Sequence, residues 1–329
     1  MPPKMPEFIQ HLRGTVELRP FISDYGPLDE PVEFAIRRFS AYHAQPNTLY
    51  LAGVHPEAVD KVAFAPISSS TQRKTRHGVF FGGISINGRR SLPVAVKTFD
   101  DDYTSWGMAM REQMVTSALK SLGVMTLRPQ GLLLSERPDG QPIAYGFTKL
   151  NDGLSNFDAL DWRQYYPNMK KNPGMQQMWH AIAYEAANIH RSGRISHNDF
   201  FGRNYCTTPT NLGFSMDNEY SLINPEPARD AETRYCASMS DIRDALRTVC
   251  LPPQVPNSDI VGFGIATKAR VPWLQVFKEV FFDDYTTARE LYIDRDPNPA
   301  DQLAAREELA ELTRTVATLA LQMENTYRE

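Results

Sequence analysis

The sequence predicts an α+β protein in which a β-rich lobe precedes a helical lobe. Between residues 62 and 149, short runs rich in β-branched and aromatic residues alternate with turn residues, which is typical of strands. The dipeptide Asn87-Gly88 lies between two of these runs, and Asn-Gly is the strongest short-range signal for a hairpin. After residue 174, apolar residues recur at spacings of three and four, as in amphipathic helices. The order of elements therefore predicts a small β-rich lobe followed by a helical lobe.

Six strands and one helix are expected in the β-rich lobe. The strands are expected at residues 48–54, 62–67, 79–86, 92–99, 132–135 and 143–149. Apolar residues spaced by four from Met110 to Leu122 predict a helix between the fourth and fifth strands. Gly123 follows directly and is a natural stop, because glycine adopts the left-handed conformation at little cost. A turn at Asn151-Asp152-Gly153 is expected to end the lobe.

Three helices are expected after this turn. They are predicted at residues 174–191, from about residue 240, and at residues 309–323. The apolar stripe of the last helix is expected to pack in the core, and a partner or dimer contact is the alternative. Prolines punctuate the first 60 residues, which also contain a helix-like stretch at 32–42. We therefore expect an N-terminal extension (1–60), a β-rich lobe (61–150), a helical core (151–260) and a C-terminal helical extension (261–329).

Composition excludes several classes of protein. The chain has 329 residues, 42% of them hydrophobic, which suits a globular protein with a substantial core. The net charge of −4 argues against a dominant nucleic-acid-binding surface. No run approaches the ~18 apolar residues of a membrane span, and the first residues lack the apolar segment of a secretory signal. The three cysteines form no Cys-x-x-Cys pair. We expect reduced thiols, a cytoplasmic location, no nucleic-acid partner and no membrane span.

The candidate chemistry lies in the segment His197–Asn204 and at Asp217. The segment has the pattern His-x-Asp-x4-Asn, and Asp217 follows a strand-like run at residues 212–216. Phosphoryl transfer asks a protein for positioning and charge neutralisation rather than for covalent chemistry. Asp199 is suited to orient an incoming hydroxyl, because its carboxylate accepts a hydrogen bond. Asn204 and Asp217 offer the oxygen ligands that Mg²⁺ prefers.

This arrangement resembles the catalytic loop and metal-binding Asp of the protein-kinase-like superfamily. The resemblance covers about residues 62–250 and implies a two-lobed protein-kinase-like fold, with a β-rich N-lobe and a helical C-lobe. It implies ATP and Mg²⁺ as cofactors, with Asp199 as the catalytic base and Asn204 and Asp217 as metal ligands. Asp241 resembles the Asp that braces the backbone of the catalytic loop from the start of a helix.

The resemblance also implies a lysine and a glutamate at the nucleotide. Lys97 ends the run Val94-Ala95-Val96-Lys97, which matches the strand lysine that pairs the α- and β-phosphates in this superfamily. Glu112 is the only acidic residue of the expected helix that follows. We therefore expect an ion pair between Lys97 and Glu112, and we expect both residues to serve nucleotide binding.

Two further segments are expected to contact the nucleotide. The adenine is expected near Lys149, Leu150 and Asn151, where the β-rich lobe ends. Ser69 and Ser70 lie in a hydroxyl-rich, basic loop whose side chains and amides are expected to cradle the phosphates, and plain surface is the alternative. A phosphate on a hydroxyl of that loop would bring negative charge beside the ATP tail, so autophosphorylation there is predicted to inhibit.

Departures from the family pattern bear on the acceptor. Asp217 is followed by Asn218-Glu219-Tyr220, which looks more like the choline/ethanolamine and aminoglycoside kinases. Phe201 stands where a phosphate-contacting lysine is common, and Arg203 is expected to supply that positive charge in catalysis. No Ala-Pro-Glu lies between Asp217 and the helix of Asp241, which leaves little room for a peptide-docking platform. Acceptor contacts are therefore expected from aromatic residues further along, with core packing as the alternative. These residues are Trp273, Phe277, Phe281 and Phe282.

The predicted function is ATP- and Mg²⁺-dependent transfer of the γ-phosphate to a hydroxyl of a specific protein acceptor, the chain itself included. A small hydroxylated molecule is the alternative acceptor. A pseudokinase scaffold would explain the atypical phosphate loop, but Lys97, Asp199, Asn204 and Asp217 together argue against it. Adenylyl transfer is a third alternative, since some atypical members of the superfamily bind ATP in reverse.

Overall fold

A computed structural model of the chain contains two compact units. The first comprises Met1–Ser121 and Thr126–Gly153, and the second comprises Leu122–Met125 and Leu154–Glu329. The structure describes residues 17–20, 46–66, 79–89, 92–100, 105–121, 123–124, 129–149, 155–156, 173–191, 193, 195–197, 200, 205–207, 212–214, 221–222, 231–250 and 277–328. The predicted helix at 32–42 and the turn at 151–153 lie outside these residues. The predicted four-part division stays a prediction.

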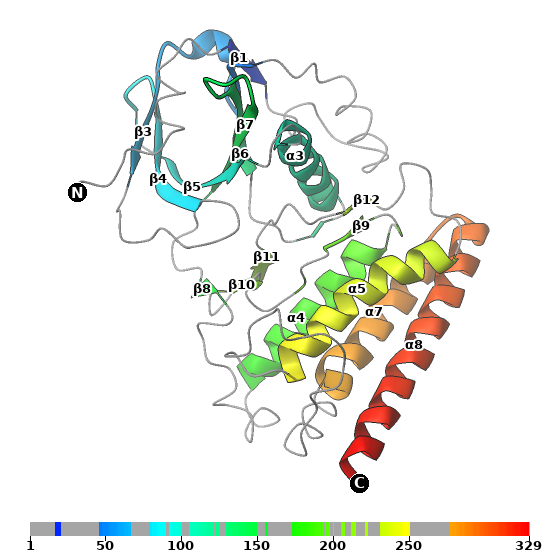
Figure 1. The fold of residues 1–329 in the computed structure, drawn as a ribbon. Coiled ribbons are helices and arrows are strands. Elements are labelled where there is room, and N and C mark those ends of the chain that lie inside the picture. The colour runs from blue at the N-terminus through cyan, green and yellow to red at the C-terminus, as the bar shows by residue number, and fades with distance from the viewer. Residues whose placement is uncertain are drawn as a thin grey trace. The chain divides into compact units, whose positions relative to one another are not determined.

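Seven described strands form one sheet in the first unit, and the ribbon shows that this sheet is curled (Figure 1). They are β1 (Glu17–Pro20), β2 (Thr48–Leu51), β3 (Val62–Pro66), β4 (Val79–Ile86), β5 (Leu92–Phe99), β6 (Pro129–Glu136) and β7 (Pro142–Lys149). Their order is β1-β2-β6-β7-β5-β4-β3. β1 and β2 are parallel, and every other neighbouring pair in this order is antiparallel. All six predicted strands are present, and β1 joins them.

Alternation along the strands gives the sheet two apolar faces, because successive side chains point to opposite sides. Leu49 and Leu133 belong to one buried cluster. Tyr50 and Leu132, their neighbours along the same strands, belong to a second cluster with residues of the helix α3 (Ser105–Ser121). One face of the sheet therefore carries a core of its own, and the other carries α3.

The predicted hairpin turn at Asn87-Gly88 is present between β4 and β5. Asn87 and Gly88 have φ angles of 52° and 71°, the left-handed conformation that these two residue types tolerate best. The backbone N–H of Arg89 donates to the carbonyl oxygen of Ile86 at 2.9 Å and closes the turn. The side chain of Asn87 also accepts a hydrogen bond from the backbone N–H of Asp60 at 2.7 Å. The turn thus ties the β4–β5 connection to the start of β3.

Helices dominate the second unit (Figure 1). They are α4 (Pro173–His190), α5 (Ala231–Cys250), the short π-helix η10 (Phe277–Phe282), α7 (Asp283–Asp294) and α8 (Pro299–Arg328). α4 packs against α7, and α5 packs against α8. Five short strands are also described here: β8 (Ser155–Asn156), β9 (Ile195–Ser196), β10 (Tyr205–Thr207), β11 (Leu212–Phe214) and β12 (Ser221–Leu222). The predicted fold class, α+β with a β-rich part and a helical part, is confirmed by these two units.

Burial along α4 and α8 follows the predicted stripes. Trp179 and Ile182 of α4 are at most 1% exposed. On α8, Leu309, Leu312 and Val316 are buried, so this stripe is part of the core of the second unit. These three residues are not available for the partner or dimer contact that was the alternative for this helix.

The helix that carries Asp241 begins earlier than the sequence predicted. α5 starts at Ala231, so Asp241 lies in the middle of the helix rather than at its start. The first half of α5 buries Arg234 and Ser238, which are 4% and 2% exposed. Because polar residues occupy these buried positions, the apolar periodicity that predicts a helix is interrupted there.

Three of the aromatic residues expected to contact an acceptor lie in the core instead. Phe277, Phe281 and Phe282 are at most 4% exposed. Phe277 stacks on Phe281, and both Phe281 and Phe282 stack on Tyr285 of α7. The prediction of acceptor contacts is therefore wrong for these three, because η10 and α7 turn their aromatic rings into the unit. Trp273 lies outside the described residues.

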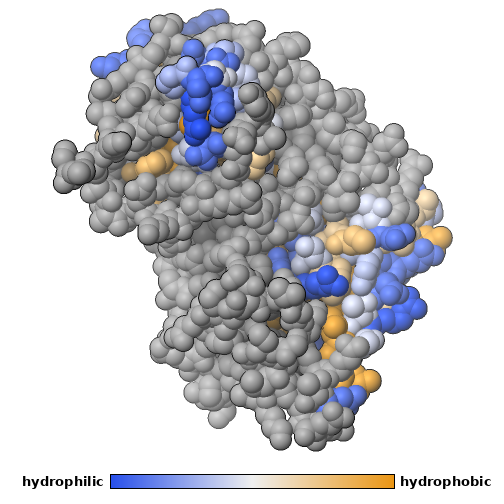
Figure 2. Space-filling model, viewed as in Figure 1, coloured by the Kyte–Doolittle hydropathy of each residue, from blue (hydrophilic) through white to orange (hydrophobic). Residues whose placement is uncertain are grey.

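The described surface of the second unit mixes polar and apolar residues (Figure 2). Among the described residues of this unit, the large hydrophobic side chains that are exposed are Leu291, Leu303 and Leu321. Leu303 and Leu321 belong to α8 and are 60% and 59% exposed. Any partner of α8 would meet these residues rather than the buried stripe.

Candidate functional site

The predicted ion pair between Lys97 and Glu112 is present in the first unit. Lys97 Nζ lies 2.8 Å from Glu112 Oε2, and the two side chains are 14% and 4% exposed. The ammonium also lies over the ring of Phe99, 5.0 Å from its centroid. β5 supplies the lysine and α3 supplies the glutamate, so the packing of helix on sheet fixes the position of the ammonium. A cation held in this way is suited to bind an anion such as a phosphate.

A glycine on the strand opposite Lys97 leaves room for the ring of Phe99. Gly146 of β7 is the register partner of Lys97. A Cβ at Gly146 would lie 3.3 Å from the ring of Phe99 and 3.6 Å from Nε2 of Gln113 on α3. The glycine therefore leaves room for the ring of Phe99, whereas the distance to Gln113 of α3 is one that a Cβ could also occupy.

Two short ladders in the second unit hold the chain on either side of the predicted catalytic and metal-binding residues. β9 pairs with β12, with Ser196 opposite Ser221. β10 pairs with β11, with Tyr205 opposite Phe214. Asn204 directly precedes Tyr205 in the sequence, and Asp217 follows shortly after Phe214. The ladders bring the segments that flank the predicted site together.

Two buried carboxylates of α5 hold the loop that contains Asp199. The backbone N–H of His197 donates to Asp241 Oδ2 at 2.7 Å, and the backbone N–H of Phe200 donates to Asp244 Oδ2 at 3.1 Å. Asp241 and Asp244 are one turn apart on α5 and are 0% and 5% exposed. A buried carboxylate needs such donors, so these bonds fix both sides of the loop.

The bracing role predicted for Asp241 agrees with this geometry, and Asp244 is an addition that the sequence analysis missed. The signal was available, since the two residues fall at spacing three on a helix, and an apolar residue follows each of them. The ring of His197, which is fully buried, packs edge-on against Phe200 at a centroid distance of 5.5 Å. This ring therefore contributes to the packing of the same loop.

Most of the other predicted site residues lie outside the described residues. These are Asp199, Arg203, Asn204, Asp217, Leu150, Asn151, Ser69 and Ser70. Lys149 is described: it is exposed at the end of β7, opposite Val94 of β5. The roles of all these residues, and of Lys97 and Glu112 at a nucleotide, stay predictions.

Two searches over the described ranges gave negative results. Within them, no three His, Cys, Asp or Glu side chains gather as a metal ion would require. The described helices include none that combines the length and the apolar character needed to cross a membrane. The two predicted metal ligands were not part of the first search, because neither lies in the described ranges.

Comparison with known proteins finds similarity only at the level of solved structures. No protein-family model matches the sequence, and no curated protein matches it. A structure of WaaP in complex with acyl carrier protein is 14% identical, with a TM-score of 0.41, over 78% of this chain and 85% of that chain. The Neurospora crassa PAN3 pseudokinase is 10% identical, with a TM-score of 0.42, over 89% of this chain and 72% of that chain.

A maize kinase domain extends this set. The kinase domain of SIRK1 (sucrose-induced receptor kinase 1), bound to AMP-PNP, is 12% identical, with a TM-score of 0.39, over 84% of this chain and 99% of that chain. Identities of 10 to 14% and TM-scores near 0.4 are too low to transfer the activity of any of these proteins to this chain.

Proposed function

We propose that the chain is an ATP- and Mg²⁺-dependent phosphotransferase that moves the γ-phosphate to a hydroxyl of a specific protein acceptor, the chain itself included. The observation that supports this best is the Lys97–Glu112 pair, 2.8 Å apart and largely buried between β5 and α3. Burying two charges is costly unless they are paired in good geometry. An ammonium that is kept charged and oriented in this way suits the phosphates of a nucleotide.

The donor set fits the two cofactors. The ammonium of Lys97 can donate three hydrogen bonds and carries the charge that phosphate oxygens need. Asn204 and Asp217 offer amide and carboxylate oxygens, the hard ligands that Mg²⁺ prefers. When bound, Mg²⁺ supplies neutralisation of the charge on the transferring phosphate. Both cofactors therefore match the chemistry of the residues predicted to hold them.

In the proposed mechanism, side chains position the reactants. Asp199 accepts a hydrogen bond from the acceptor hydroxyl, orients its oxygen and takes its proton. Asp241 and Asp244 support this step, because they hold the backbone of His197 and Phe200 on either side of Asp199. Arg203 adds positive charge beside the phosphate.

In this proposal, side chains and backbone groups from strands and from loops hold the nucleotide. Lys97 orients the α- and β-phosphates, with Glu112 fixing its position. Ser69 and Ser70 supply hydroxyls and amides to the phosphate tail. The segment Lys149–Asn151 lies along the adenine.

Parallel incubation with [γ-³²P]ATP and [α-³²P]ATP tests the function. The wild-type chain is expected to label itself or an added acceptor from the γ-position only. Lys97→Met is expected to lower this labelling at least about tenfold, while its ATP-induced thermal shift changes less. Lys61→Met is the matched control, since Lys61 is an exposed lysine of the same unit.

Each other outcome contradicts the proposal in a distinct way. Label from the α-position indicates adenylyl transfer. Label from neither position, with an ATP-induced thermal shift, indicates the pseudokinase scaffold. Undiminished γ-labelling by Lys97→Met removes the proposed role of the ion pair. Labelling of a small hydroxylated compound in place of protein replaces the acceptor class.

A further inference from the structure

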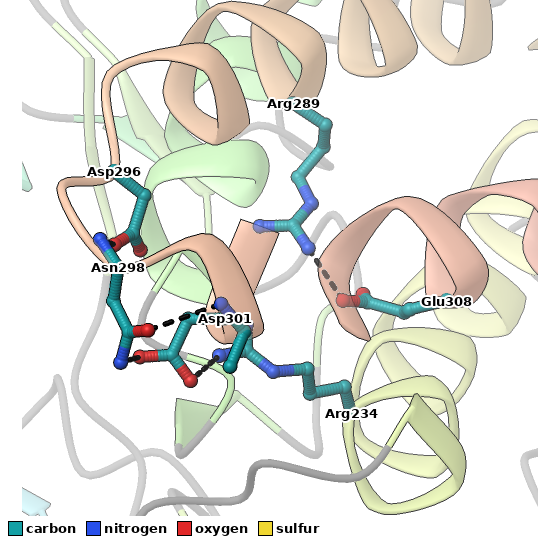
Figure 3. Close-up of polar contacts among 7 residues, drawn as sticks. Arg234, Arg289, Asp296, Asn298, Asp301 and Glu308 are labelled. Carbon is teal, nitrogen blue, oxygen red and sulfur yellow. Dashed lines mark hydrogen bonds and ion pairs between the residues drawn. The ribbon is translucent and has the colours of Figure 1, made fainter. Parts of the chain in front are cut away.

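A buried ion pair connects α7 and α8 in the second unit. Arg289 Nη2 of α7 lies 2.5 Å from Glu308 Oε2 of α8, and the side chains are 1% and 0% exposed. In Figure 3, the two side chains point toward one another from their helices. The hydroxyl of Ser238 on α5 donates to the other carboxylate oxygen of Glu308 at 2.5 Å. Glu308 therefore joins three helices in the interior of the unit.

Tyr285 lies one turn before Arg289 on α7, so the two side chains share a face of the helix. Burial raises the pKa of the Tyr285 hydroxyl well above its ordinary value, and the nearby Arg289 charge only partly opposes this. Burial by itself would lower the pKa of Arg289, but Glu308 and Tyr285 together outweigh it and raise that pKa. Tyr285 therefore stays protonated, and Arg289 stays charged.

The hydroxyl of Tyr285 reaches the bracing carboxylate through His190, the last residue of α4. Tyr285 Oη lies 2.9 Å from His190 Nδ1, and His190 Nε2 lies 2.8 Å from Asp241 Oδ2. An ionised Asp241 can only accept, so His190 Nε2 carries a hydrogen and donates it. With a neutral ring, Nδ1 then accepts the hydroxyl proton of Tyr285.

The same oxygen of Asp241 accepts the backbone N–H of His197 at 2.7 Å. His197 begins the loop that contains Asp199. Buried polar groups thus lie in a row from α8 through α7 and α4 to this loop. Hydrogen bonds join Tyr285, His190, Asp241 and the backbone of His197. The Arg289–Glu308 ion pair lies next to them, one turn of α7 beyond Tyr285.

We propose that Tyr285, Arg289 and Glu308 are positioning residues for the loop of Asp199, acting through His190 and Asp241. The inference rests on the proposed phosphotransferase function, because it assigns these residues a part in turnover. From Tyr285 to His197 each buried group needs the hydrogen bond of the next, so loss of one leaves its neighbour unsatisfied. The Arg289–Glu308 pair acts on Tyr285 through the charges that it places one helical turn away. The loss is transmitted to Asp241 and hence to the orientation of the loop. α8 in this way sets the catalytic rate without contacting the reactants.

Two tyrosine variants distinguish a positioning role in turnover from a contribution to stability alone. Tyr285→Phe removes only the hydroxyl that contacts His190. Tyr235→Phe is the matched control: its hydroxyl lies 3.0 Å from Thr315 Oγ1, so it also links two helices of the unit, α5 and α8, but it has no contact with His190 in the hydrogen bonds of the described residues. Tyr285→Phe is expected to lower kcat about tenfold or more with the KM for ATP unchanged, and Tyr235→Phe is expected to leave both unchanged.

Replacement of the whole ion pair tests α8 without leaving a lone buried charge. The double variant Arg289→Met, Glu308→Leu keeps the volume apolar and is expected to fold, since such replacements of buried pairs are often tolerated. Its kcat is expected to fall as in Tyr285→Phe. The control is Arg306→Met with Asp294→Leu, which removes an exposed α7–α8 ion pair of 2.7 Å and is expected to leave kcat unchanged.

Hydrogen exchange of the His197 backbone N–H gives a readout that does not depend on activity. Its exchange is expected to accelerate about tenfold in Tyr285→Phe and in the Arg289, Glu308 double variant, and in neither control. Equal kcat in Tyr285→Phe and Tyr235→Phe, or exchange at His197 that does not respond, overturns the proposal. A wild-type chain that transfers neither label overturns the proposed function instead, and the exchange comparison then still decides whether the row positions the loop.

Discussion

The buried charges around the candidate site are each satisfied by a specific neighbour. Glu112 is 4% exposed and pairs with Lys97. Asp241 is fully buried and accepts the N–H of His197 while lying 2.8 Å from His190 Nε2. Removal of one partner from a buried pair typically costs ~3–5 kcal/mol, because the remaining charge stays out of water. Substitutions that keep the shape of the side chain are therefore the informative ones at these positions.

Glu112→Gln tests the ion pair by replacing one carboxylate oxygen with an amide nitrogen. The amide keeps an acceptor for Lys97 but removes the negative charge, so the ammonium is held less firmly. We expect turnover to fall about tenfold while the fold is kept, as followed by circular dichroism and steady-state kinetics. Glu136→Gln, an exposed glutamate of β6, is the control and is expected to behave as wild type. Activity of Glu112→Gln within about twofold of wild type would contradict the assignment.

Asp199→Asn tests the proposed base. The amide cannot take a proton from the acceptor hydroxyl, so turnover is expected to fall at least about a hundredfold. The midpoint of thermal unfolding is expected to stay the same, because the bracing bonds of His197 and Phe200 involve other carboxylates. A variant that keeps more than about a tenth of the wild-type rate shows that the base lies elsewhere.

At the scale of elements, the helix α5 contacts both the segment of His197 and Phe200 and the helix α8. Asp241 and Asp244 accept hydrogen bonds from the backbone N–H groups of His197 and Phe200. Arg234 and Ser238, earlier on the same helix, contact Asp301 and Glu308 of α8 at 3.4 and 2.5 Å. Figure 3 shows Arg234 and Asp301 joined in this way. A single helix therefore contacts both this loop and α8, and its Asp241 is also the residue through which the proposed row of buried groups reaches the loop.

The turn between β4 and β5 is an element whose stability depends on one side chain. Asn87→Ala places a residue with a Cβ and no polar group at a φ of 52° and removes the hydrogen bonds to Asp60, Lys61 and Ala58. We expect a loss of ~1–2 kcal/mol, seen as a fall of roughly 2–8 °C in the midpoint of thermal unfolding. Arg89→Ala, two residues further along the same turn, is the control. Equal midpoints for the two variants would show that the side-chain bonds of Asn87 contribute nothing.

At the scale of the whole molecule, two observations argue against a docking site for an extended peptide acceptor. α5 begins at Ala231, so the stretch after Asp217 is shorter than a helix starting near residue 240 would allow. The aromatic residues Phe277, Phe281 and Phe282 are buried and do not line an acceptor site. Acceptor recognition is therefore expected to need a folded partner rather than an extended peptide.

We accordingly expect generic kinase substrates to be labelled poorly or not at all. The comparison is between casein, myelin basic protein and short peptides on one side and the chain itself on the other, each with [γ-³²P]ATP. Asp199→Asn is run in parallel to identify contaminating activity. Strong labelling of generic substrates at several sites, lost in Asp199→Asn, would restore an ordinary protein-kinase specificity.

Local patterns account for the parts of the fold that the sequence predicted well. The strands β4 and β5 and the turn between them follow from alternation and from Asn87-Gly88, which act over a few residues. Gly123 ends α3 in the predicted left-handed conformation, with a φ of 80°. Glu112 was found as the partner of Lys97 because α3 offers no other acidic residue.

By itself, the sequence determined the order of the elements, the turn at Asn87-Gly88, the Lys97–Glu112 pair and the bracing Asp241, since short-range spacing and a known motif pattern carry that information. Only the tertiary structure decided which distant residues meet. His190 and Tyr285 are 95 positions apart, and Ser238 and Glu308 are 70 positions apart. No spacing rule connects such residues, because their contact depends on how α4, α5, α7 and α8 pack. The same packing buried the aromatics of η10, which a linear pattern cannot distinguish from residues that line a site.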